Sequence, residues 1–114
     1  MDTVDQLEFC VGWDALAKSC HDNAVAKGFW DKERNDGEAI ALMHSELSEA
    51  LEALRHGNPP DDKVPKWTGV EAEFADVVIR MMDLAYARKW DVAGAIIAKM
   101  AMNTTREKMH GKEF

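Results

Sequence analysis

The stretch HSELSEALEALRHG, residues 44–57, decides the fold together with VEAEFADVVIRMMDLA, residues 70–85. In both, apolar residues recur every three or four positions, which is the period of an amphipathic α-helix. Each stretch also carries a pair of acids spaced three residues apart: Glu46 and Glu49, then Glu73 and Asp76. On a helix, this spacing places both carboxylates of a pair on one face, a turn apart.

The two acid pairs hold the same position relative to the apolar faces of their helices. At about 100° per residue, the centre of the apolar stripe lies about 90° from Glu46 in one helix and from Glu73 in the other. If the helices pack antiparallel, the four carboxylates meet at one edge of the core and repel one another unless a cation lies between them. Oxygen ligands favour Mg2+, with Mn2+ as the second choice. The sequence therefore predicts a metal site, although a lone E-x-x-E is more often a solvated surface.

Capping and breaking signals predict an all-α fold without strands. The first expected helix is Val4–Ala26, which follows a Thr3-x-x-Gln6 capping box, and the second begins after Asn35 or Asp36 and ends at Gly57. The third is capped by Thr68 and Glu71, and the fourth runs from Asp91 to about Met109. We see no repeat and no low-complexity segment, so residues 1–114 are expected to form a single four-helix domain.

The composition of the chain limits the kinds of partner that we expect it to bind. A net charge of -7 argues against binding nucleic acid or an anionic membrane. No run approaches the roughly 18 apolar residues of a membrane span, and the N-terminus lacks the positive charge of a secretory signal. Cys10 and Cys20 fall on one helix about 15 Å apart along its axis, so we expect reduced thiols and a cytoplasmic protein. A chain this small would gain buried surface from a second copy.

The last predicted helix carries a polar stripe made of Lys99, Asn103, Arg106 and His110. Two cations and an amide on one face would suit a polyphosphate bound opposite an acidic metal site. A solvated basic face near a helix C-terminus explains the same pattern.

Two residues near the acids are also open to two interpretations. Asp83 could orient a metal-bound water or be a surface acid, and Arg80 could neutralise the acids or contact a ligand.

Aromatic residues offer a candidate base site. Trp30 and Trp67 fall in predicted loops beside the acid helices, where an indole could stack on a base. His21 could hydrogen-bond a base edge, although a lone helical histidine is more often structural. The sequence contains no glycine-rich phosphate loop, no G-x-S-x-G and no Cys/His metal cluster.

The motifs E-L-S-E and E-F-A-D, separated by 23 residues, resemble the E-x-x-E…E-x-x-D signature of the MazG-like all-α nucleotide pyrophosphohydrolases. The ending K-M-A-M-N-T-T-R-E-K-M-H-G-K, residues 99–112, resembles the usual end of MazG-like domains. The resemblance covers the chain from about Gly28 onward. It is nearest to the dCTP-pyrophosphatase and phage MazG-like branches.

The resemblance implies hydrolysis of a nucleoside triphosphate to the monophosphate and pyrophosphate by a homodimer or tetramer. Mg2+ would be held by Glu46, Glu49, Glu73 and Asp76, and we choose Glu49 as general base. The residues that match nucleotide-contacting positions or the family ending are His21, Trp30, Lys99, Asn103 and Arg106. His56 stands where the dCTP-pyrophosphatase branch has a second aromatic, so cytosine preference stays open. The alternatives are a non-catalytic helical nucleotide-binding or dimerisation module and a plain structural bundle.

Overall fold

A computed structural model gives the structure of the chain and describes residues 1–106 and 108–113. It contains four α-helices and a final 3-10 turn: α1 (Thr3–Ala26), α2 (Asp36–Arg55), α3 (Gly69–Arg88), α4 (Val92–Asn103) and η1 (Lys108–Gly111). Within the described residues, β-pairing is limited to one isolated bridge between Pro60 and Thr68. The all-α prediction is therefore confirmed.

Three of the four predicted helix starts are confirmed by their caps. The side chains of Asn35 and Asp91 accept backbone N–H bonds from Glu38 and Gly94, and Thr68 forms the predicted capping box with Glu71. The first start is wrong by one residue, because the Asp2 carboxylate caps α1 by accepting from the N–H of Asp5. An ionised acid at this position also interacts favourably with the helix dipole.

Helix α4 is shorter than predicted, since it ends at Asn103 rather than near Met109. The hydroxyls of Thr104 and Thr105 donate to the carbonyls of Ala101 and Met102, at 2.7 and 2.8 Å. Such hydroxyl bonds compete with continuation of the helix. The predicted stripe is therefore not carried by one helix: Arg106 lies beyond its end, and the side chain of His110 is outside the described residues.

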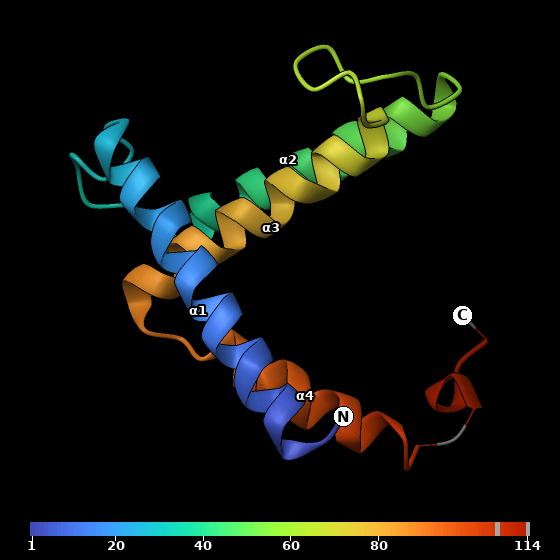
Figure 1. Ribbon diagram of the computed structural model, residues 1–114. Helices are drawn as coiled ribbons and strands as arrows, with labels where there is room; N and C mark the ends of the chain where they lie inside the picture. Colours follow the sequence, from blue (N-terminus) through green and yellow to red (C-terminus); the bar gives the residue numbers. More distant parts are fainter. Residues whose placement is uncertain (107, 114) are drawn as a thin grey trace.

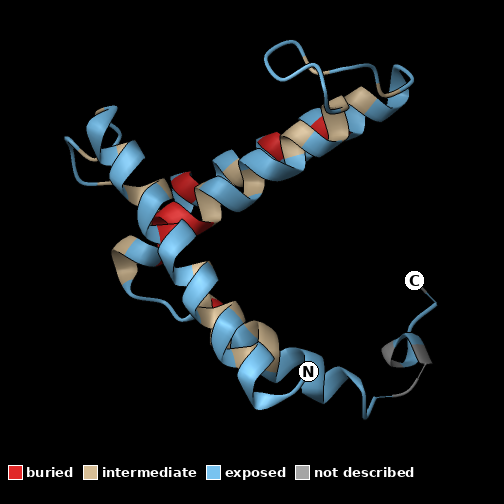
Figure 2. Ribbon diagram, in the orientation of Figure 1, coloured by how far each residue is buried: buried red, intermediate tan, exposed pale blue. Residues whose placement is uncertain are grey.

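Helices α2 and α3 form an antiparallel hairpin, and the C-terminal part of α1 crosses the end of α3 (Figure 1). Helix α4 lies along the N-terminal part of α1 and points away from the hairpin. Buried residues gather where α1 meets α3 and occur singly along the α2–α3 seam (Figure 2). The chain thus has two arms joined at the α1–α3 crossing.

The seam between α2 and α3 is built from small side chains and one acid. On α2, the buried residues are Ala39, Glu46 and Ala50. The larger apolar side chains of this helix remain exposed: Leu47, Leu51 and Leu54 are 47%, 51% and 57% exposed. Alanine lets the two helices approach closely, which turns the larger aliphatic side chains to the flank.

The single chain leaves much apolar surface uncovered. It exposes 8646 Å², whereas a compact 12.8 kDa monomer exposes about 6300 Å². Its radius of gyration is 16.5 Å, against about 13 Å expected for a compact domain of this length. None of the helices in the described part of the chain is both long enough and apolar enough to span a bilayer.

Candidate metal centre

Three of the four predicted metal ligands meet between α2 and α3. Glu46 and Glu49 come from α2 and Glu73 comes from α3, and each offers a carboxylate oxygen within 4.8 Å of the others. We call these three residues the acid cluster. Two stacked acids on α2 face one on α3 because the helices are antiparallel and the i, i+3 spacing keeps Glu46 and Glu49 on one face. A cluster of this kind could hold a metal ion.

The members of the cluster differ in their surroundings. Glu46 is only 8% exposed, accepts a 3.2 Å hydrogen bond from Nε of Arg80 and forms an ion pair with Nη2 of the same guanidinium at 3.1 Å. Glu49 is exposed. One carboxylate oxygen of Glu73, Oε2, is buried and has no hydrogen-bond partner. A buried acceptor without a donor is costly, and a bound cation would satisfy it.

A side-chain hydrogen bond between Glu46 and Glu73 shifts the pKa values of the two carboxyls in opposite directions. This hydrogen bond raises the pKa of Glu73 to about 8, with burial and the nearby Glu49 adding to the rise. The same bond lowers the pKa of Glu46, and Arg80 lowers it further. Two carboxylates at this distance cannot both ionise readily without a compensating cation.

Asp76, the fourth predicted ligand, lies one turn further along α3 and outside the 4.8 Å cluster. Partial removal from water and the charge of Glu46 raise the pKa of its carboxyl, while Arg80 and Lys63 act in the opposite direction. Asp61 also contributes to the rise. The effects of Lys63 and Asp61 show that the connection between α2 and α3, residues 56–68, brings both a cation and an acid close to Asp76.

The acid cluster and Asp76 line a cavity of about 680 Å³, which we call the acid cavity. Its walls come from α1, the α1–α2 loop (residues 27–35), α2, the α2–α3 connection and α3. Along α3 the lining residues Glu73, Asp76, Arg80 and Asp83 fall on one stripe. That stripe spans about 15 Å at 1.5 Å per residue. A ligand larger than a lone ion can therefore lie beside the cluster.

Asp83 closes the far end of the acid cavity and is 5% exposed. Its Oδ1 is 2.9 Å from Nδ1 of His21 and accepts a 2.8 Å bond from the indole N–H of Trp30. Its Oδ2 accepts a 3.0 Å bond from Nη1 of Arg34. The interpretation of Asp83 as a surface acid is wrong, because this buried acid ties α1 and the α1–α2 loop to α3.

Two of the predicted substrate contacts, His21 and Trp30, are therefore brought together on Asp83, with ring centroids 5.2 Å apart. The guanidinium groups of Arg34 and Arg88 lie 5.1 and 5.5 Å from the centre of the Trp30 ring. Arg88 is itself held by a 2.8 Å bond to Asp36 and a 3.0 Å bond to the carbonyl of Arg34. In this arrangement the indole packs against guanidinium groups.

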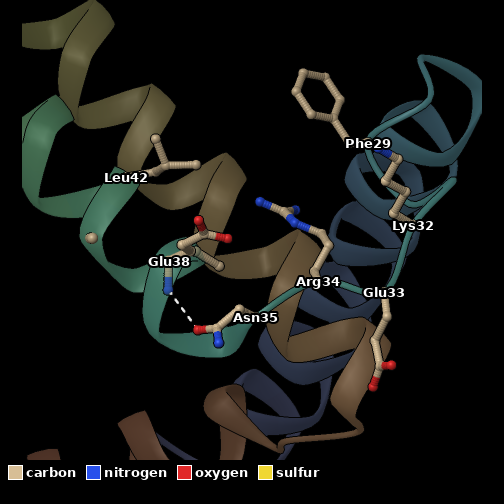
Figure 3. Close-up of a pocket in the computed structure, with 9 residues that line it drawn as sticks. Phe29, Lys32, Glu33, Arg34, Asn35, Glu38 and Leu42 are labelled. Carbon is tan, nitrogen blue, oxygen red and sulfur yellow. Dashed lines mark hydrogen bonds between the residues drawn. The ribbon is translucent and has the colours of Figure 1, made fainter.

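A second cavity, of about 530 Å³, adjoins the acid cavity at Phe29 and Arg34, which line both. We call it the loop pocket, because it lies between the α1–α2 loop and the start of α2. The guanidinium of Arg34 stands between Phe29 on the loop side and Glu38 and Leu42 on α2 (Figure 3). Asn35 at its floor is engaged by its 3.0 Å capping bond to the N–H of Glu38.

The remaining predicted contacts lie on the other arm. Lys99 and Asn103 belong to α4, which packs against α1, and Arg106 follows α4. In the described part of the chain, none of these three lines the acid cavity or the loop pocket. Within one chain, the structure does not bring the predicted basic stripe to the predicted metal site.

Sequence reasoning missed two cations that do line the acid cavity, Arg34 and Lys63. Arg34 directly precedes the Asn35 cap, and Lys63 follows the turn-forming run NPPDD at residues 58–62. Those adjacent signals place Arg34 just before α2 and Lys63 in the connection between the two acid-bearing helices. Together with the acid motifs, they are the sequence signal that could have identified both cations.

The geometry thus supplies an acidic cluster that could hold a metal ion, a 680 Å³ cavity beside it and positive side chains that line this cavity. Comparison with protein-family models, with curated proteins and with solved structures found no match to this chain.

Proposed function

We propose that the protein is a Mg2+-dependent nucleoside triphosphate pyrophosphohydrolase of the MazG-like type. The observation that carries the proposal is the acid cluster, in which a buried oxygen of Glu73 lacks a hydrogen-bond donor. The motif resemblance adds the reaction class. The absence of sulfur and nitrogen ligands from the cluster favours a hard cation, and Mg2+ is the one that bridges carboxylates to phosphates.

Glu46, Glu49 and Glu73 would hold the cation, with Asp76 completing the set from the next turn of α3. Once bound, the cation neutralises phosphate charge and lowers the pKa of a coordinated water. Arg80 holds Glu46 in place through one hydrogen bond and an ion pair. Because the pKa of Glu73 is raised to about 8, binding of a cation to its carboxylate would favour loss of a proton.

Glu49 is the residue we assign as general base. It is the exposed acid of the cluster, so its carboxylate faces the cavity in which a substrate and a water would lie. Glu46 is engaged by Arg80, and the neighbouring acids and burial raise the pKa of Glu73. Glu49 would take the proton of the attacking water, and cleavage between the first and second phosphates would give a nucleoside monophosphate and pyrophosphate.

We further propose that two copies associate through the outer flank of the α2–α3 hairpin. Leu47, Leu51 and Leu54 on α2, and Phe74 and Val78 on α3, are large apolar side chains left exposed there. Covering this flank would remove part of the surface that the open single chain leaves in water. Sedimentation velocity tests this directly: we expect a dimer or a tetramer, and a monomer at micromolar concentration would contradict it.

Product analysis tests the activity. The purified protein is incubated with Mg2+ and each common NTP and dNTP, and the products are separated by ion-exchange chromatography. We expect the monophosphate and pyrophosphate from at least one substrate, and none when EDTA replaces Mg2+. Diphosphate with free phosphate would place the cleavage at another bond. Mg2+-dependent binding without turnover would instead support the non-catalytic binding module.

A further inference from the structure

The acid cavity has two chemically different ends. At one end, Arg34 and Phe29 separate it from the loop pocket. At the other, Lys63 lines it together with Asp61, Asp62 and Val64 of the α2–α3 connection. The acid cluster lies between these two ends. A ligand that extends beyond the cations it binds would therefore meet different side chains in each direction.

Arg34 is fixed in a position suited to binding an anion. Its side chain is only 16% exposed, Nη1 donates to Asp83 and the guanidinium stacks on Trp30. A guanidinium carries five N–H donors, and the bond to Asp83 uses one of them. Arg34 lines both cavities, and its guanidinium stands in the loop pocket (Figure 3). A preorganised guanidinium of this kind binds phosphate with little further loss of freedom.

Lys63 lies in the α2–α3 connection, whose conformation is held by hydrogen bonds. The Asp61 carboxylate accepts 3.0 Å bonds from the backbone N–H groups of Lys63 and Val64. The base of the connection is closed by 2.9 Å backbone bonds from Gly69 to Pro59 and from Asp61 to Trp67. These contacts place the Lys63 side chain over the cavity, on the side of Asp76.

The loop pocket contains an exposed aromatic ring on which a nucleobase could stack. Phe29 is 58% exposed and is the aromatic residue among those described as lining either cavity. Its ring stands opposite Leu42 (Figure 3). Trp30, by contrast, packs against the guanidinium groups of Arg34 and Arg88. Stacking on Phe29 requires no rearrangement of the Asp83 contacts, whereas stacking on Trp30 would displace an arginine.

We propose that the ligand lies in one direction along the cavity, with its nucleoside in the loop pocket against Phe29 and its terminal phosphate at Lys63. Arg34 then contacts the phosphate nearest the sugar, and the other phosphates lie over the acid cluster, whose carboxylates would hold the cation. This inference rests on the proposed function and adds the orientation of the substrate. It predicts that Lys63 recognises the pyrophosphate part and that Phe29 recognises the nucleoside part.

Calorimetric titration with two probes separates these roles. In the presence of Mg2+, the protein is titrated with inorganic pyrophosphate and with the common nucleoside monophosphates. Lys63→Met should weaken pyrophosphate binding about tenfold, the loss expected for one charge-assisted contact, and leave monophosphate binding unchanged. Phe29→Ala should do the reverse. Phe29→Tyr should restore monophosphate binding, because it keeps the ring.

Lys66→Met is the matched control for Lys63. Lys66 belongs to the same connection, but its ammonium lies 5.8 Å from the Trp67 ring centre and it does not line the acid cavity. Its replacement should leave the affinities for both probes unchanged. Both lysines and Phe29 are exposed, so thermal unfolding should show that each variant folds like the original protein.

Two results would overturn the orientation. If Lys63→Met and Lys66→Met bind pyrophosphate equally well, Lys63 does not contact the terminal phosphate. If Lys63→Met instead impairs monophosphate binding and Phe29→Ala impairs pyrophosphate binding, the ligand lies the other way round. A protein that binds neither probe with Mg2+ would refute the proposed function itself, and the orientation with it.

Discussion

The two arms of the molecule show how differently a sequence motif can be realised in three dimensions. On the α2–α3 hairpin, acids that lie far apart in the sequence are brought within 4.8 Å because two long helices pack antiparallel (Glu46, Glu49 and Glu73). On the α1–α4 arm, the basic stripe is interrupted because α4 ends at Asn103. Periodicity is informative only as far as the helix that carries it continues.

The two arms also differ in the contacts that hold them in place. The hairpin is joined to α1 and the α1–α2 loop by the buried Asp83, with partners at 2.8 to 3.0 Å. On the other arm, Ala93 is the buried residue of α4, and Met100 and Met102 are 54% and 58% exposed. We therefore expect substitutions at the joint to cost more stability than substitutions on α4.

The largest expected effect comes from breaking the joint. Asp83→Ala removes the acceptor for three donors and leaves the Arg34 guanidinium partly buried without its partner, so we expect a loss of about 3 kcal/mol in the free energy of unfolding. Urea denaturation measures it. The control is Asp22→Ala, which removes an exposed partner of Lys18 and should cost less than about 1 kcal/mol. Equal costs would mean that the Asp83 contacts do not hold the two arms together.

Removing the proposed base should affect turnover without affecting the fold. Glu49 is exposed, so Glu49→Gln should unfold at nearly the same temperature as the original protein while its turnover falls about 100-fold or more. Steady-state kinetics with the best substrate checks this. Exchanging Glu52, an exposed acid on α2 that does not line the acid cavity, for Gln provides the matched control. A Glu49→Gln variant with full activity would remove this residue from the reaction.

The acid cluster should make the stability of the metal-free protein depend on pH. Because the pKa of Glu73 is about 8 in the folded protein and its ordinary value is 4.5, the folded protein binds more protons than the unfolded chain between these values. The contribution of Glu73 to stability is therefore fully present below pH 4.5 and is lost as the pH rises through 8. Thermal unfolding in EDTA measures the trend, and Glu73→Gln should flatten it. An unchanged slope in that variant would show that Glu73 titrates normally.

The smallest expected effect is on α4. Lys99 does not line either cavity within one chain, so Lys99→Met should change nucleotide affinity less than about twofold. Calorimetry with pyrophosphate and the nucleoside monophosphates, the probes used for the Lys63 variant, gives the comparison. A tenfold loss would show that α4 of a second copy reaches the acid cavity, and would restore the basic stripe to the site.

Much of the fold follows from local signals in the sequence. Caps at Asn35, Thr68 and Asp91 and the break at Gly57 fix three helix starts and one end, since each satisfies or removes specific backbone groups. The end of α4 was not predictable from apolar periodicity, because it depends on competing hydroxyl bonds by Thr104 and Thr105. Leu47 and Leu51 are exposed because α3 covers a different face of α2. The sequence of α2 alone does not determine which of its faces another helix covers.

Part of the candidate site was likewise predictable from the sequence, and part was not. The proximity of the acid cluster follows from spacing together with antiparallel packing, both of which the sequence indicates. The role of Asp83 does not, because its partners come from α1 and the α1–α2 loop, 49 to 62 positions away. Nothing in the helical pattern around Asp83 indicates which loop would reach it. Contacts between distant segments were therefore the part that required the structure.

Titration of the metal-free protein with Mg2+ is the most direct test of the central claim, that the acid cluster binds a divalent cation. Calorimetry in buffers of different ionisation enthalpy would measure the affinity and the protons released. At pH 7 we predict saturable binding with proton release in the original protein, because Glu73 gives up its proton, and loss of both in Glu73→Gln. Binding of equal strength in the two proteins would contradict the account.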